Sequence, residues 1–199
     1  MRHDKLLEAC NRNNLPAALT RSILREHEGL SCQINVGAFT SMDDVPFLSG
    51  GNQGGRNTRK LWCLYLMQAM KTTLQLWEVE SRVWMLDGAS LNYAVWADDI
   101  VVYAATHTQL VTKLQDLLTA LSDFGLDFKE DGLCWSCDAS FPYGLEPITL
   151  AHPTKGAVDI PFEPKVNILG TAFDHRGSSE TSLEHRLKQA WQHWHERKS

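Results

Sequence analysis

The sequence predicts a mixed α+β fold with antiparallel strands. Amphipathic segments with helical spacing alternate along the chain with short runs of strand-forming residues. An Asp-Gly pair, which is a strong hairpin signal, joins two of these strand-like runs. The apolar fraction of 43% is ordinary for a globular protein of 199 residues. Together these observations predict one sizeable folded domain, or one and a half small ones.

The N-terminal part is predicted to contain helices on either side of a strand. Residues 4–27 have a helical pattern in which Pro16 opens a second helix. Residues 31–39 alternate apolar and polar side chains, which predicts a strand, and residues 41–47 predict a turn and a short extended piece. The amphipathic segment 58–80 predicts a long helix.

The C-terminal part is predicted to contain strands, a helix, and strands again. Thr106 and Gln109 fit a capping box at the start of the helix, and Gly125 fits its C-terminal stop. The predicted elements are strands at 82–86, 91–96 and 100–104, a helix at 107–124, mostly irregular chain at 126–163 with short strands allowed at 133–135 and 148–150, a strand at 166–173, and a C-terminal helix capped by Thr181 and Glu184.

Charge and cysteine content limit the binding partners and the cellular location that we expect for this protein. The net charge of −5 is mildly acidic, whereas a free-standing nucleic-acid binder is usually basic, so binding to nucleic acid is expected to be weak. No apolar run is long enough to span a membrane, and no signal peptide is visible. The scattered cysteines, five in number, favour reduced thiols in an intracellular protein, cytoplasmic or nuclear.

Two adjacent aspartates, Asp98 and Asp99, interrupt an apolar run from Leu91 to Ala105. The flanking strands are apolar on both faces, which predicts strands in the middle of a covered sheet. A carboxylate in such a place is costly unless it is paired, hydrogen-bonded or bound to a metal. A two-residue hairpin tip favours Asn-Gly or Asp-Gly, but "WADDI" has no glycine. We therefore expect a constrained hairpin tip at the aspartates.

The residues alone leave two interpretations of the pair open. One is a solvated acidic turn, and the other is a cation site. Adjacent residues of an extended chain point to opposite sides, so only one of the two aspartates is expected to be a firm ligand. A divalent cation held by oxygen ligands would be Mg²⁺ or Mn²⁺, usually bound together with substrate phosphates.

The stretch "WADDIVVYAATHTQLVTKLQDLLTALSDFGLDF" resembles the reverse transcriptases of non-LTR (LINE-type) retrotransposons. It has a strand, an aromatic-Ala-Asp-Asp turn, an apolar strand, and a leucine-rich helix that closes on Phe-Gly-Leu. The resemblance implies that Trp96 is the aromatic residue of the catalytic motif. It also implies that Asp98 is the catalytic metal ligand and that Asp99 acts beside it.

Further segments are similar to the same family in order and spacing. "SGGNQGGRNT" resembles the glycine-glutamine loop that positions template and incoming nucleotide, and "VNILGTAF" resembles the Leu-Gly hairpin that grips the primer end. The binding residues that this resemblance implies, besides Trp96, are Gly50, Gln53, Gly54, Leu169 and Gly170.

The resemblance covers nearly the whole chain and implies a polymerase palm. Its antiparallel sheet would be covered by helices and followed by a thumb-like C-terminal helix. The implied domains are a partial palm at 1–163, and a primer-grip-like strand with the start of the thumb at 164–199. The implied activity is RNA-directed DNA polymerisation, in which a DNA primer is extended on an RNA template from deoxynucleotide triphosphates with Mg²⁺ or Mn²⁺.

The chain also departs from the family pattern. The family's first catalytic aspartate lies upstream of the segment that "MRHDKLLEAC" resembles, so the chain is expected to begin after it. Two-metal transfer needs ions about 3.5–4 Å apart, and in this family that aspartate bridges them. We therefore expect the chain to be inactive by itself. The family's lysine after Phe-Gly-Leu is replaced by Gly132, and Lys129 is displaced from its position.

Rival functions come from other classes. One is a non-catalytic protein derived from a retroelement, either nucleic-acid-binding or structural. Another is a magnesium-dependent hydrolase, which is disfavoured because no general base stands out near the aspartates. Cys134 and Cys137 have zinc-knuckle spacing, but no second pair lies at a matching distance, which favours a structural role for them.

Overall fold

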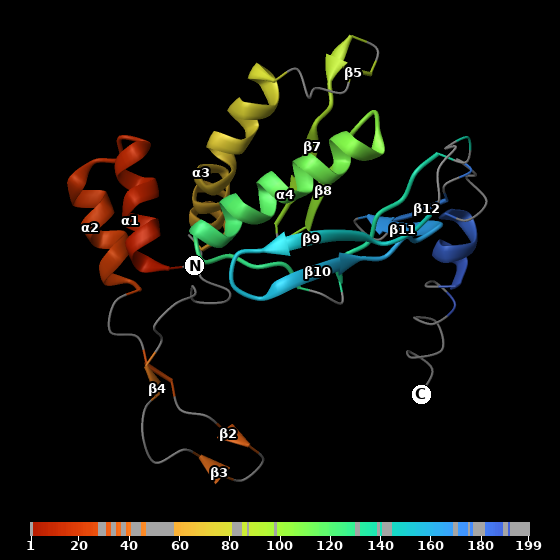
Figure 1. The fold of residues 1–199 in the computed structure, drawn as a ribbon. Coiled ribbons are helices and arrows are strands. Elements are labelled where there is room, and N and C mark those ends of the chain that lie inside the picture. Colours follow the sequence, from red (N-terminus) through yellow and green to blue (C-terminus); the bar gives the residue numbers. More distant parts are fainter. Residues whose placement is uncertain are drawn as a thin grey trace. The chain divides into compact units, whose positions relative to one another are not determined.

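The computed structural model, drawn in Figure 1, describes most of the chain. The described residues are 2–27, 31–32, 35–36, 39–40, 45–46, 58–80, 85–86, 88–97, 99–129, 132–138, 140, 145–168, 171–174, 176, 182–188 and 191. Of the predicted site residues, six lie outside them, namely Gly50, Gln53, Gly54, Asp98, Leu169 and Gly170.

The chain divides into two compact units. The first comprises Met1–Arg82 with Asp116–Asp127, and the second comprises Val83–Gln115 with Phe128–Ser199. Helix α4 (His107–Asp123) contributes residues to both. Each unit contains helical residues and antiparallel strand pairs, so the predicted mixed α+β class is confirmed.

Three helices form most of the first unit: α1 (His3–Arg12), α2 (Ala17–Arg25) and α3 (Thr58–Val79). The predicted helical segment 4–27 is divided because Asn14 has φ of 54°, a left-handed conformation that Asn tolerates better than most residues. Pro16 then caps α2, so its predicted role at the start of a second helix is confirmed. The predicted helix over 58–80 is confirmed by α3.

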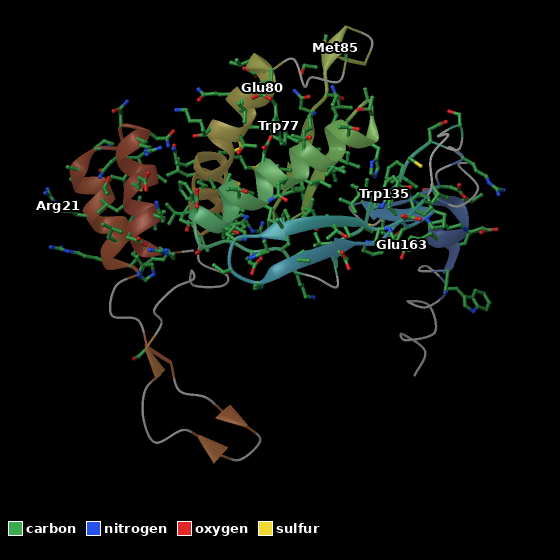
Figure 2. All side chains as sticks on the ribbon, in the orientation of Figure 1. Arg21, Trp77, Glu80, Met85, Trp135 and Glu163 are labelled. Atoms are coloured by element: carbon green, nitrogen blue, oxygen red, sulfur yellow. The ribbon has the colours of Figure 1, made fainter. Side chains whose placement is uncertain are left out.

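The core of the first unit lies between these helices and the second half of α4. Trp77, labelled in Figure 2, is fully buried, and its Nε1 donates to Asp116 Oδ2 at 3.1 Å. The Tyr65 hydroxyl donates to the carbonyl of Phe124 and accepts from the Arg2 amide at 3.2 Å. The buried apolar side chains include Leu6, Ala9, Cys10, Leu61, Leu66, Ala69, Met70, Leu117, Leu118 and Leu121.

The predicted strand at 31–39 is wrong as a single strand. β1 (Ser31–Cys32) pairs with β4 (Val45–Pro46), and β2 (Asn35–Val36) pairs with β3 (Phe39–Thr40). The run therefore contains both strands of a tight hairpin. Gly37 gives the physical reason, since glycine weakens a strand interior and favours a chain reversal.

Hairpins dominate the second unit. β5 (Met85–Leu86) pairs with β6 (Ala89–Ser90), and β7 (Tyr93–Trp96) pairs with β8 (Asp99–Val102). The predicted Asp-Gly hairpin is confirmed, with Gly88 at φ of 79°. β11 (Lys165–Ile168) pairs with β12 (Thr171–Asp174), so the single strand predicted at 166–173 is also wrong. Two strands of a hairpin occupy that segment, as the family resemblance implied.

The strand pair β9 (Ile148–His152) and β10 (Gly156–Ile160) lies in the segment predicted to be mostly irregular. Only the start of β9 was predicted. The turn between them places Gly156 at φ of 90°, and His152 Nδ1 accepts from the amides of Thr154 and Lys155, both at 3.1 Å. Nearby, Trp135 exchanges main-chain hydrogen bonds with Pro161 and Glu163, beyond the end of β10 (Figure 2).

Both predicted ends of α4 are confirmed. Thr106 Oγ1 accepts from the Gln109 amide at 3.2 Å, and Gln109 Oε1 accepts from the Ala105 amide at 3.2 Å, which forms a capping-box arrangement. At the other end Gly125 has φ of 68°, and the amide of Leu126 donates to the Leu121 carbonyl at 2.9 Å. This is a Schellman motif, which requires the left-handed residue that glycine supplies.

All described ladders are two-stranded and antiparallel. The antiparallel pairing agrees with the prediction, but the described strands do not join into one larger sheet covered by helices. Residues 182–188 are helical, in the segment predicted to hold the C-terminal helix. Within the described part of the chain, no helix is long and apolar enough to cross a bilayer.

Candidate functional site

The candidate site is the tip of the β7–β8 hairpin in the second unit (Figure 1). Its strands are rich in Tyr, Val, Ile and Trp, which favour extended backbone. The pairing runs from Tyr93 opposite Val102 to Trp96 opposite Asp99. Two residues, Ala97 and Asp98, therefore connect the strands. The prediction of a hairpin tip at the aspartate pair is confirmed, whereas the role of the pair as ligands stays a prediction.

Ala97 has a left-handed backbone, with φ of 56°. For a residue with a Cβ atom this conformation costs roughly 1–2 kcal/mol. Two-residue hairpins ordinarily place Gly, Asn or Asp where φ is positive, because their twist then matches that of the strands. The β7–β8 ladder holds alanine in this conformation. The tip is therefore constrained rather than relaxed.

One face of the β7 strand is more exposed than the other. Tyr93 and Val95 are half-buried, whereas Ala94 and Trp96 are exposed, and the Trp96 side chain reaches 68% exposure. Asp99 is exposed as well. The expectation that both faces of this strand are covered is wrong, because the apolar residues of β7 alternate between a covered and an open side. Asp99 and Trp96 are thus neighbours on an accessible end of the ladder.

Asp99 supplies an accessible carboxylate, and Asp98 lies outside the described residues. Carboxylate oxygens in an open position fit a hard cation such as Mg²⁺, which keeps several waters and takes few protein ligands. Among the side chains that the structure describes, no group of three or more His, Cys, Asp and Glu is gathered for a metal ion. Asp99 therefore does not belong to a metal-binding cluster of three or more such side chains among the described residues.

The opposite end of the hairpin is attached to α4 by Lys113. This side chain is completely buried, and its Nζ donates to Asn92 Oδ1 at 3.0 Å and to the Tyr103 carbonyl at 2.7 Å. Lys113 is not among the site residues predicted from the sequence. Its spacing carries a usable signal, since it lies three residues after Leu110 and four before Leu117, on the apolar face of the helix.

The remaining implied binding residues lie outside the described part of the chain, but the elements beside them are described. Ile168 pairs with Thr171, so Leu169 and Gly170 are the residues that connect β11 to β12. The glycine-glutamine segment precedes α3, which begins at Thr58 as that resemblance implied. Lys129 is exposed in the second unit.

The Cys134 and Cys137 pair does not have the character of a reactive site. Burial raises the pKa of the Cys134 thiol, and the nearby Glu163 adds to the effect. Burial also raises the pKa of the Cys137 thiol, with a contribution from Asp138. Both residues are free thiols. A nucleophilic cysteine needs a lowered pKa, so these shifts do not favour a reactive thiol.

Comparison with models of protein families finds no match to this chain. Comparison with curated proteins likewise finds none.

Proposed function

We propose that this chain is part of a reverse-transcriptase palm, in which the β7–β8 hairpin presents the metal-binding aspartates. The proposal begins from the resemblance of "WADDIVVYAA" and its following helix to the non-LTR retrotransposon enzymes. In this proposal Asp98 is the principal ligand of Mg²⁺ or Mn²⁺, and Asp99 contributes charge beside it. The β11–β12 hairpin would contact the primer end through Leu169 and Gly170.

The observation that carries the proposal is the conformation of Ala97. A tight turn that only joined two strands would be more stable with glycine or asparagine at this position. Strained backbone tends to persist where the surrounding structure needs a particular geometry, and it gathers at functional sites. Ala97 directly precedes Asp98 and lies two residues before the exposed Asp99. The strain therefore supports a turn selected for the placement of carboxylates.

The chemistry of the residues agrees with this role. When bound, Mg²⁺ ions would neutralise phosphate charge and support in-line attack by a primer hydroxyl. The two aspartates supply oxygen ligands of the preferred kind. The exposed ring of Trp96 is available to stack on a nucleobase, a contact that does not depend on base sequence. The net charge of −5 predicts weak binding of nucleic acid by the isolated chain.

The rival function is a non-catalytic protein of retroelement origin, in which the acidic turn is merely solvated. The two proposals differ in what the aspartates bind. In a palm the hairpin binds a divalent cation through Asp98. In the rival the aspartates have no ligand, and their replacement by asparagine changes only the surface charge.

Binding of Mn²⁺, measured by electron paramagnetic resonance on the full chain, tests the proposal. We expect one weak site that Asp98→Asn removes and Asp99→Asn weakens. Asp123→Asn, which removes an exposed carboxylate at the end of α4, is the matched control and should leave the affinity unchanged. If D98N binds Mn²⁺ as tightly as the wild type, the palm proposal is wrong and the rival is favoured.

Primer extension gives a second readout. Nucleotidyl transfer uses two metal ions, and the two aspartates of the hairpin could hold one cation but hardly organise two. We therefore expect no extension of a DNA primer on an RNA template by the chain alone, with either Mg²⁺ or Mn²⁺. Extension that D98N abolishes would show an active polymerase and overturn the expectation of inactivity.

A further inference from the structure

Lys113 is an unusual core residue. Lysine is among the residues least often fully buried, because removal of an ammonium group from water is costly. Lys113 is nevertheless 0% exposed. Its position on α4 corresponds to the helix face that elsewhere carries leucines. A methionine of similar length would fill the same space without this cost, so the ammonium group itself calls for an explanation.

The two acceptors of Lys113 lie on the two strands of the aspartate hairpin. Asn92 directly precedes β7 and Tyr103 directly follows β8, and the Tyr103 amide donates to the Asn92 carbonyl at 2.9 Å. The side-chain amide of Asn92 makes a second hydrogen bond, in which Nδ2 donates to Ser90 Oγ at 3.1 Å. One ammonium group thus joins both strands to α4, and charge-assisted hydrogen bonds of this kind are the stronger ones.

Lys113 contacts the hairpin at the end opposite the candidate site. The pair Asn92 and Tyr103 continues the register of the ladder beyond the pair of Tyr93 and Val102, whereas Trp96 and Asp99 form the last pair at the tip. The distance along the strand from Asn92 to Trp96 is four residues, or about 13 Å.

The separation between Asn92 and the tip determines whether Lys113 acts on the tip through its charge or through the hydrogen-bonded ladder. Screening in physiological salt has a length of about 8 Å, so direct attraction between the ammonium group and the tip carboxylates is weak. A mechanical effect does not decay in this way, because the ladder is a continuous hydrogen-bonded element. The hydrogen bonds of Lys113 hold the base of the hairpin, and a continuous ladder joins that base to the turn at Ala97.

We infer that Lys113 is a positioning residue, which holds the β7–β8 hairpin against α4 so that its tip binds a divalent cation. This inference rests on the proposed function, since it concerns the same cation site. It adds a residue outside the aspartate motif, on the helix that follows it. The aspartate motif itself does not assign that role to any residue of the helix.

The first experiment does not depend on metal. Hydrogen exchange of the β7, β8 and Tyr103 amides is measured by NMR in the wild type, Lys113→Met and Asn92→Ala. We expect exchange in the hairpin to accelerate about tenfold or more in both variants, because K113M lacks both hydrogen bonds of the ammonium group and N92A lacks one of them. The β9–β10 amides should not change. Lys71→Met makes the same chemical change at an exposed position of α3, and should leave the hairpin at the wild-type rate.

The second experiment measures Mn²⁺ affinity in the same variants. We expect the dissociation constant to rise about tenfold in K113M and N92A, the lower end of the range for residues that orient metal ligands. Asn92→Asp keeps an oxygen acceptor for Lys113 and should restore both affinity and exchange protection. K71M should bind as the wild type does. Because N92A changes a partly exposed residue, it keeps the test available if K113M fails to fold.

The outcomes separate the two proposals. Unchanged hairpin exchange in N92A would overturn the positioning role. Faster exchange with unchanged Mn²⁺ affinity would overturn it too, since Lys113 would then be structural only. If D98N binds Mn²⁺ as the wild type does, the proposed function itself fails and the positioning role falls with it, whatever the exchange rates show.

Discussion

Trp96 and Asp99 are directly opposite each other in the last pair of the β7–β8 ladder, and both side chains are exposed. An aromatic ring and a carboxylate are thereby presented together beside a strained two-residue turn. The ring offers a surface for a nucleobase, and the carboxylate offers oxygen to a cation. In the proposed palm, these two groups would contact the primer-template and the cation.

Replacement of the exposed tryptophan tests the nucleic-acid part of this account. We expect Trp96→Ala to weaken binding of a fluorescent RNA–DNA primer-template by about 1–3 kcal/mol, the usual contribution of one base stacked on an aromatic side chain. Fluorescence anisotropy at low salt measures the change. Trp191→Ala is the matched control, since Trp191 is 67% exposed in the same unit. Equal losses in W96A and W191A would argue against a site at the hairpin.

Relief of the strained turn should raise stability. Ala97→Gly removes the Cβ atom from a left-handed residue, and we expect the free energy of unfolding to increase by about 1 kcal/mol. Ala157→Gly makes the same change within β10, where glycine should lower stability by about 0.5–1 kcal/mol. Urea unfolding measures both variants. A loss of stability in A97G would show that the left-handed alanine is not strained.

Stability should decline in alkaline solution, and Cys10 should contribute to this decline together with Cys134 and Cys137. Burial raises the pKa of the Cys10 thiol in the folded state. The unfolded thiol ionises near its ordinary pKa of about 8.5, so above this pH the folded state binds more protons than the unfolded state. The free energy of unfolding then falls as the pH rises, and this contribution is fully present below the unfolded pKa.

Urea unfolding between pH 7 and pH 9.5 checks this prediction. Cys10→Ala should flatten the alkaline decline, although its cavity lowers stability at every pH. Leu66→Ala opens a larger cavity without removal of a thiol, and should keep the slope of the wild type. Tyr65, whose pKa burial also raises, adds to the decline only at higher pH. Parallel curves for C10A and L66A would contradict the assignment.

Local signals account for the elements that sequence reasoning predicted correctly. Both ends of α4 follow from Thr106, Gln109 and Gly125, whose side chains or backbone satisfy the helix termini directly. The β5–β6 hairpin follows from Asp-Gly for the same reason. Such signals lie within a few residues of the structure that they specify, so no tertiary information is needed.

Two segments were predicted incorrectly because the alternation of apolar and polar residues was considered without the glycines that interrupt it. Residues 31–39 alternate like one strand, yet Gly37 allows the reversal that pairs Val36 with Phe39. β10 was missed although Gly156 is followed by a clear alternation of small or polar and apolar residues. In both segments a glycine was the informative residue, because it marks where the chain changes direction.

The candidate site was predictable in part. Two adjacent charges in an apolar run without glycine predicted a constrained tip, and the left-handed Ala97 agrees with it. Lys113 was not predicted, because one polar residue among leucines on a helix face is usually taken as a solvent-exposed neighbour. Its bonds to Asn92 and Tyr103 join segments 21 and 10 residues away, and only the folded chain brings them together.

A titration with substoichiometric Mn²⁺, followed in amide NMR spectra of the full chain, would locate a cation bound at the aspartate hairpin. Paramagnetic broadening falls steeply with distance, so it locates the bound ion. The account predicts that Ala97 and Asp99 broaden first, while Val158 and Ile160 of β10 stay sharp. Broadening first at the exposed carboxylates of α1, with the β7–β8 tip unaffected, would contradict a cation site at the aspartate hairpin.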